Sequence, residues 1–158
     1  MSITIRRAIS NDVEALAALR TDFLAEEDSI HDEAERTTFL QLTRQYFAQT
    51  IPSGEFISWV AEAEGEIVAT SGLIFFQRPP SLHNPSGKEA FILNMNTVPQ
   101  WRSRGLATQL LQALLRYVQT QTDARRIWLY ATPPGRSIYE KAGFKAKQRE
   151  MLEMDLTW

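Results

Sequence analysis

One segment constrains the fold more than any other: a β-rich run that ends at a proline and leads within a few residues into an amphipathic helix. The run spans Ala90 to Val98, and Pro99 ends it because proline has no backbone N–H to donate to a strand ladder. The helix that follows carries an apolar stripe at helical spacing, formed by Leu106, Leu110, Leu111, Leu114, Leu115 and Val118. This junction indicates a domain that contains both strands and helices.

The segments before this junction add an earlier strand, two helices and a hairpin. Ile3 to Arg7 alternates as a short first strand, and two helical patterns then run as far as Pro52. Phe56 to Glu62 and Glu66 to Gln77 are rich in aromatic and β-branched residues and are separated by a short turn that contains glycine. We therefore expect two antiparallel neighbouring strands here.

The segments after the junction predict a short strand, a helix and two final strands. Ile127 to Ala131 is typical of a short buried strand, Thr132-Pro133 suits the start of a helix, and Phe144 to Asp155 supplies the last strands. The resulting order is β-α-α-β-β-β-α-β-α-β-β, an α+β arrangement. No linker or repeat interrupts it, so we expect a single domain over residues 1–158.

Composition excludes several classes of function. Without cysteine the chain has no thiolate nucleophile or cysteine metal site, and its histidines, His31 and His83, lack metal-ligand spacing, so no metal is expected. A net charge of −2 does not favour nucleic acid as a partner. Apolar stretches such as Leu73 to Phe76 are too short to cross a membrane, and the first ten residues lack a secretory signal pattern. The expected location is the cytoplasm.

The turn between strand and helix has the chemistry of an anion site. Backbone N–H groups at the start of a helix point outward and share the positive end of its dipole, and Arg102 and Arg104 add positive charge beside Gly105. The local pattern R-x-x-G-x-A also fits an ordinary surface turn, so the turn by itself leaves both interpretations open.

A second motif gives the turn its meaning. About thirty residues later the chain reads Tyr139-Glu140-Lys141-Ala142-Gly143-Phe144. With this segment, the R-x-x-G-x-A turn and the order of its elements, the whole chain resembles the GNAT superfamily of acetyltransferases. The resemblance implies a GNAT-like mixed, mostly antiparallel sheet flanked by helices. It also implies an acyltransferase that uses acetyl-CoA as co-substrate.

The resemblance assigns roles to three groups of residues. Family members hold the pyrophosphate of acetyl-CoA on the amides of the turn, which here belong to Ser103, Arg104, Gly105, Leu106, Ala107 and Thr108, beside Arg102. The family's pantetheine arm lies along the fourth strand, which points to the main chain of Met95, Asn96 and Thr97. The tyrosine of the second motif commonly protonates the departing thiolate, so Tyr139 is the expected catalytic acid. A packed core tyrosine is the alternative.

The acceptor side is less defined. Strand alternation places Asn94 and Asn96 on the same face as Ile92, where the amides could orient a substrate or water or could satisfy loop backbone groups. No general base is evident. Glu26 and Glu27 belong to an acidic connector that could attract a cationic amine or could be a solvated turn.

These observations favour N-acetyltransfer to an amine of a small molecule, by direct attack in a ternary complex. Two alternatives remain: a protein N-terminus or lysine as the acceptor, and a non-catalytic domain that senses acetyl-CoA. Small enzymes of this family are often dimers, so a homodimer is also open.

Overall fold

The computed structural model describes residues 2–147 and 154–158. Its strands are β1 (Ile3–Arg7), β2 (Trp59–Ala63), β3 (Glu66–Gln77), β4 (Lys88–Thr97) and β5 (Arg126–Leu129). Its α-helices are α1 (Val13–Glu26), α2 (Glu33–Ser53), α3 (Leu106–Gln121) and α4 (Arg136–Lys141), and short 3-10 turns cover Ser10–Asp12 and Pro99–Trp101.

The five strands form one sheet in sequence order. The first three pairings are antiparallel, and β4 pairs with β5 in parallel. The β2–β3 hairpin turns at Glu64 and Gly65, which both have positive φ as a tight turn between twisted strands requires. The predicted α+β class, hairpin and element order are therefore confirmed as far as α4. The strands expected over Phe144 to Asp155 fall largely on residues 148–153, which lie outside the described residues.

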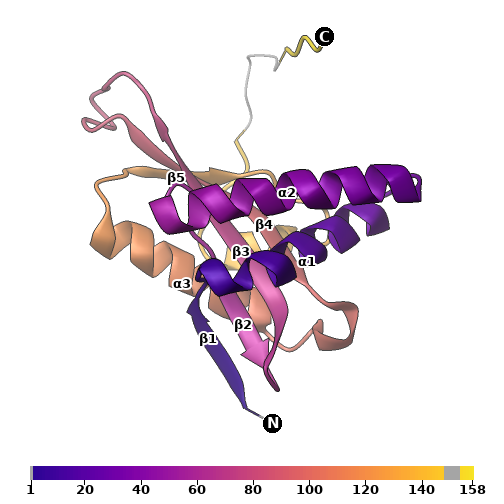
Figure 1. The fold of residues 1–158 in the computed structure, drawn as a ribbon. Coiled ribbons are helices and arrows are strands. Elements are labelled where there is room, and N and C mark those ends of the chain that lie inside the picture. Colours follow the sequence, from indigo (N-terminus) through magenta and orange to yellow (C-terminus); the bar gives the residue numbers. More distant parts are fainter. Residues whose placement is uncertain (1, 148–153) are drawn as a thin grey trace.

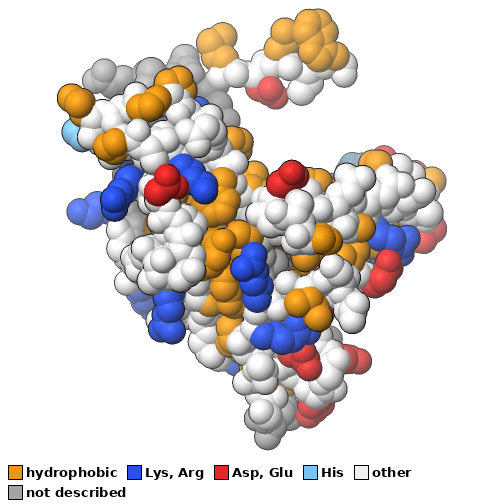
Figure 2. All heavy atoms as spheres, turned by 60° about the vertical axis from the view of Figure 1, so that its left-hand side comes forward, with side chains coloured by type: hydrophobic (Ala, Val, Ile, Leu, Met, Phe, Trp, Pro, Cys, Tyr) orange, Lys and Arg blue, Asp and Glu red, His pale blue; other side chains and the backbone are white. Residues whose placement is uncertain are grey.

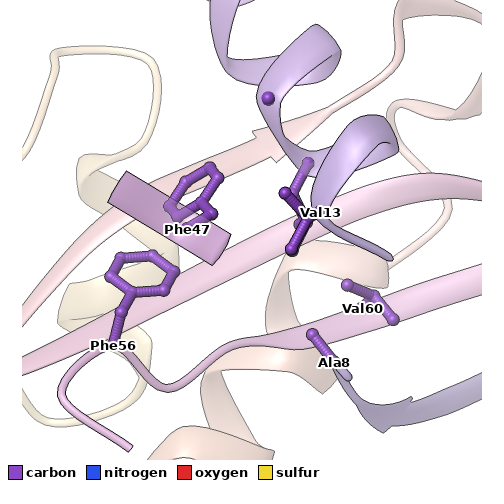
Figure 3. Packing of buried hydrophobic residues seen from close by; sticks show 7 residues of the cluster. Ala8, Val13, Phe47, Phe56 and Val60 are labelled. Atoms are coloured by element: carbon purple, nitrogen blue, oxygen red, sulfur yellow. The ribbon is translucent and has the colours of Figure 1, made fainter. Parts of the chain in front are cut away.

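Helices cover both faces of the sheet (Figure 1). One core lies under α1 and α2, where Leu16, Phe47 and Phe56 are buried. Figure 3 shows the Phe47 and Phe56 rings side by side in this core. The opposite face packs on α3 through its leucine stripe, with Leu110 and Leu114 fully buried. Because α3 covers one face of the sheet, the side of the helix that faces the sheet is apolar.

A β-bulge in β4 changes which residues share a face. Gly72 on β3 pairs with Leu93 and Thr70 pairs with Asn96, so two residues of β4 lie opposite one residue of β3. Asn94 adopts a φ of 56° at this point. Because an extra residue shifts the alternation, the expectation that Asn94 and Asn96 share a face with Ile92 is wrong. Ile92 packs with the α3 side, whereas both asparagines contact α1.

The fourth helix begins later than its sequence signal indicates. Thr132 and Pro133 belong to a turn in which the Thr132 carbonyl accepts from the N–H groups of Gly135 and Arg136. The helix itself starts at Arg136. Proline fits the first residue of a helix and the first positions of a turn equally well, so the local signal did not separate the two.

Some apolar surface stays outside the two cores. In Figure 2, apolar side chains gather as a band through the middle of the face in view, with Lys and Arg side chains along it. The hairpin that joins β3 to β4 projects from the body of the molecule (Figure 1), and its Leu82 is almost fully exposed. No helix within residues 2–147 and 154–158 is long and apolar enough to cross a membrane.

Candidate active site

The sheet opens between β4 and β5. Their parallel pairing runs from Glu89–Arg126 to Ile92–Leu129, and β5 then ends. β4 continues to Thr97, still paired with β3 on its other side. On the β5 side, the main chain from Leu93 to Thr97 meets no strand of the described residues. This free edge contains Met95, Asn96 and Thr97 and leads directly into the turn before α3.

That turn has the backbone conformation of an exposed amide cradle. Ser103 and Gly105 both have positive φ, of 61° and 77°. No side chain of the described residues caps the start of α3, so the N–H groups of Leu106, Ala107 and Thr108 lack a helical or side-chain acceptor. A Cβ built on Gly105 would meet nothing within 4 Å. The space over the turn is therefore open to an anion, which the helix dipole favours at this end.

The side chains of two arginines make contacts within and around the turn. The Arg102 Nε donates to the Thr97 carbonyl at 2.9 Å, and its Nη2 donates to the Glu26 carboxylate at 2.7 Å. Arg104 lies over the Trp101 ring, 4.7 Å from the ring centroid, and donates to the Gln100 carbonyl. Their guanidinium charges stay beside the amide cradle.

Tyr139 lies on α4, which follows β5. Its half-buried ring packs with the α3-side core and meets Phe144 edge to face, with 5.9 Å between ring centroids. Gly135 lies close to the same ring. Burial raises the pKa of the Tyr139 phenol above its usual value of 10.0, so the phenol is protonated at neutral pH.

The two asparagines of β4 both reach α1. Asn96 Nδ2 donates to the Leu19 carbonyl at 3.2 Å, and Asn94 Oδ1 accepts from Arg20 Nη1 at 3.4 Å. The Asn94 carbonyl also accepts from the buried Thr70 hydroxyl. The side chains of both asparagines thus link the bulge to α1.

A cavity of about 580 Å³ lies between α1, the start of α2 and the end of β4. Its lining residues are Leu19, Asp22, Ala25, Glu26, Arg36, Asn96, Val98, Pro99 and Gln100. Glu26 therefore lies at this cavity, whereas Glu27 is exposed and is absent from its lining. Part of the acidic connector has a structural role, since Asp32 accepts from the Glu35 N–H and begins α2.

A smaller cavity of about 300 Å³ lies on the other side of α1. It is lined by Arg20, Phe39, Leu42, Thr43, Tyr46, Phe47, Phe56 and Leu93. Arg20 is a residue of this cavity that no sequence motif singled out. A signal was available, because Arg20 follows Val13, Leu16 and Ala17 on the buried face of α1, where an arginine is unusual.

Glu89, the carboxylate at the other end of β4, is structural. It is buried between Arg78, at 2.9 Å, and Arg126, at 3.1 Å. Burial opposes its ionisation, but the hydrogen bonds from Arg126 and Arg78 outweigh burial and hold the pKa of Glu89 below its usual value. No three His, Asp or Glu side chains in the described part of the chain form a group that could hold a metal ion.

Known proteins that resemble this chain are acetyltransferases. A model of the acetyltransferase (GNAT) family matches residues 16–144. N-acetyltransferase 8 of Rattus norvegicus is 28% identical over 102 residues, which span 63% of this chain and 44% of that protein. The chain therefore matches less than half of that relative's length.

Two solved structures share the fold over nearly all of both chains. A predicted acetyltransferase from Clostridium acetobutylicum, solved with acetyl-CoA, is 28% identical, with a TM-score of 0.84 over 98% of this chain and 96% of the other. An aminoglycoside acetyltransferase from an uncultured soil metagenomic sample is 21% identical, with a TM-score of 0.71 over 100% of this chain and 99% of the other. The chain thus belongs to the acetyltransferase (GNAT) family, acyltransferases whose acetyl transfer is generally acetyl-CoA-dependent.

Proposed function

We propose that this protein transfers the acetyl group of acetyl-CoA to a primary amine of a small molecule, by direct attack in a ternary complex. The observation that carries the proposal is the free edge of β4 beyond Ile92, which leads into the uncapped amides at the start of α3. Acetyl-CoA has an extended arm that carries the thioester at one end and the pyrophosphate at the other. The arm can pair with the free edge of a strand, and the pyrophosphate can accept from uncapped amides at the start of a helix.

The donor would lie along the main chain of Met95, Asn96 and Thr97. Its pyrophosphate would accept from the amides of the cradle, Ser103, Arg104, Gly105, Leu106, Ala107 and Thr108. Arg102 stands beside the cradle and adds a positive charge. In this arrangement the thioester lies near the bulge, at the point where β4 and β5 separate.

Tyr139 is the proposed catalytic acid. The neutral amine attacks the thioester carbonyl, the new C–N bond forms, and the C–S bond breaks as the Tyr139 phenol gives its proton to the departing sulfur. The nitrogen loses one proton to water as the amide forms. Because burial raises the pKa of the phenol, the proton is present at neutral pH. The tyrosinate regains a proton from solvent after each turnover.

The acceptor must lose a proton before it attacks. For an alkylamine of pKa about 10.4, this costs roughly 4.6 kcal/mol at pH 7. Asp22 and Glu26 line the larger cavity, each in an ion pair with an arginine, Arg36 and Arg102. An ammonium group of the acceptor would compete with these arginines for the carboxylates, and Glu27 adds negative charge at the end of α1. Asn94, at the bulge, would orient the acceptor. A cavity of about 580 Å³ suits a small molecule, the acceptor class named for the metagenomic structure.

The decisive experiment measures free CoA released from acetyl-CoA with three acceptor sets: small primary amines, peptides with a free N-terminus, and peptides with an internal lysine. Release with small amines at higher kcat/KM than with either peptide supports the proposal. Release with peptides alone would make the protein a peptide or protein acetyltransferase. Acetyl-CoA binding by calorimetry, without release on any acceptor, would make it a sensor domain.

A further inference from the structure

Arg20 is a half-buried cation without an ionic partner in the described structure. Its nearest polar contact is Asn94 Oδ1 at 3.4 Å, and it lies 5.8 Å from the centroid of the Phe39 ring. Among residues 2–147 and 154–158, no carboxylate forms an ion pair with it. Arg6 and Arg126, also largely buried, each contact a carboxylate within 3.1 Å. Burying a guanidinium without a counter-charge is unfavourable, and burial lowers the pKa of Arg20.

Asn94 places a second unsatisfied donor at the same point. Its side chain is more than nine-tenths buried, and its Nδ2 has no hydrogen-bond partner in the part of the chain that the structure describes. A guanidinium can only donate, so the amide must turn its oxygen toward Arg20 and leave its N–H groups unpaired. Buried polar groups are normally satisfied, so an unpaired cation here indicates a missing acceptor. Asn94 is enclosed and is not among the residues that line the smaller cavity, so the donor open to a ligand is the Arg20 guanidinium.

The walls of the smaller cavity beside Arg20 indicate the chemical nature of the rest of the ligand. Its walls are largely apolar and aromatic, with the Phe47 and Phe56 rings 4.8 Å apart (Figure 3) and Tyr46 edge to face with Phe56. Its lining contains no carboxylate, and Arg20 is its charged residue. A volume of about 300 Å³ holds a compact ligand with an apolar body.

The smaller cavity lies next to the part of β4 where the proposed acetyl transfer takes place. Leu93 lines it, and Asn94 follows at the bulge, where β4 departs from β5. A ligand anchored at Arg20 would therefore lie across β4 from the free edge that the proposed function assigns to the donor. An amine on that ligand would be directed at the thioester.

We propose that Arg20, which donates to Asn94 Oδ1 through one guanidinium nitrogen, binds a carboxylate of the acceptor, whose apolar body fills the aromatic cavity between α1, α2 and β4. The inference rests on the proposed function but places the body of the acceptor in the smaller cavity instead of the larger one. It narrows the substrate class to amines that carry a carboxylate, with the spacing of an amino acid. A lone guanidinium among largely apolar walls matches a single carboxylate in charge, and its planar group of donors can bind both carboxylate oxygens.

The test compares phenylalanine with phenylalaninamide, which keeps the amine and the ring and replaces the carboxylate by a neutral group. The measured quantity is the ratio of their kcat/KM values, compared between variants so that the different amine pKa values cancel. We expect Arg20→Met to lower this ratio about 10- to 100-fold, mainly through KM, because a hydrogen bond to a charged group is lost. The ratio for Arg20→Lys should lie between those of the wild type and Arg20→Met. Arg116→Met, on the exposed face of α3, is the matched control and should keep the wild-type ratio.

A second experiment measures ligand binding and does not depend on turnover. Calorimetry with 3-phenylpropionate should show binding to the wild type and to Arg116→Met but not to Arg20→Met, while circular dichroism and acetyl-CoA affinity verify that the Arg20 variants are folded. If no amine releases CoA, the proposed function fails, yet selective loss of 3-phenylpropionate binding would still support the anion site. An unchanged kcat/KM ratio in a folded Arg20→Met overturns the inference. Tighter binding of phenylphosphonate than of 3-phenylpropionate would overturn the carboxylate assignment.

Discussion

Arg102 and Glu26 form an ion pair, with 2.7 Å between Arg102 Nη2 and Glu26 Oε2. The pair joins the turn before α3 to the last residue of α1, so it links the proposed donor site to the larger cavity. Both side chains are close to half exposed, at 47% and 45%, and such surface pairs contribute little to stability. An incoming pyrophosphate could therefore compete with Glu26 for the guanidinium.

Glu26→Gln should tighten the binding of acetyl-CoA. The substitution removes a negative charge next to the expected pyrophosphate position and releases Arg102, so we expect the Kd to fall about two- to fivefold at low salt. Calorimetric titration with acetyl-CoA measures this change. Glu27→Gln is the control, because Glu27 is exposed and carries the same charge, whereas the carboxylate that pairs with Arg102 belongs to Glu26. Weaker binding in Glu26→Gln would show that the pair helps to shape the site.

Gly105→Val should weaken acetyl-CoA binding by about tenfold or more, because its side chain would occupy the open space over the amide cradle. Gly54→Val is a matched control. Gly54 ends α2 with a φ of 76°, against 77° at Gly105, and a Cβ there also meets nothing within 4 Å. Both variants should lose a similar 1–2 kcal/mol of stability, roughly the cost of left-handed backbone in a residue other than glycine. Equal acetyl-CoA affinity in the two variants would refute the pyrophosphate assignment.

Tyr139→Phe should lower kcat by about 100-fold or more with little change in the Kd for acetyl-CoA, because it removes the acid and keeps the ring. A raised phenol pKa means that the acid form persists to higher pH, so the alkaline fall in wild-type activity should lie above pH 10. Steady-state rates from pH 7 to pH 11 test both points. Tyr117→Phe on α3 is the control. If Tyr139→Phe keeps the wild-type kcat, the tyrosine is a packing residue.

Asp12→Asn should destabilise the fold by about 2 kcal/mol. Asp12 is buried and accepts from Arg6 at 2.8 and 2.9 Å and from the Ile9 N–H at 2.8 Å. The hydrogen bonds from Arg6 hold its pKa below the usual 3.8, against the effect of burial. A lowered folded-state pKa stabilises the protein above the unfolded pKa, and this contribution is lost as the pH falls through the folded value.

Urea unfolding at pH 7 and at pH 3 measures the Asp12 contribution. The difference between wild type and Asp12→Asn should be largest at pH 7 and should shrink below about pH 4. Glu14→Gln removes an exposed ion pair with Arg44 and should change stability by less than about 0.5 kcal/mol. A pH-independent difference between wild type and Asp12→Asn would contradict the electrostatic explanation.

Local sequence patterns predicted much of the architecture. Alternation and turn residues predicted the β2–β3 hairpin, and the leucine stripe after Pro99 predicted α3, because these signals depend on neighbours within one or two turns of chain. The turn from Arg102 to Thr108 was also located correctly at the start of α3. Its pairing with Glu26 was not predictable, since the two residues are 76 positions apart.

The sequence by itself determined the order of the elements as far as α4, the family and the place of the turn with uncapped amides before α3, all of which follow from short-range patterns and two motifs. Only the tertiary structure decided where the side chains of β4 point. The bulge opposite β3 adds one residue, and this single shift turns Asn94 and Asn96 toward α1 while Ile92 stays on the α3 side. The structure alone also revealed Arg20 as a half-buried cation without a carboxylate partner among the described residues, because burial and charge pairing depend on contacts between α1, α2 and β4 that no local pattern encodes.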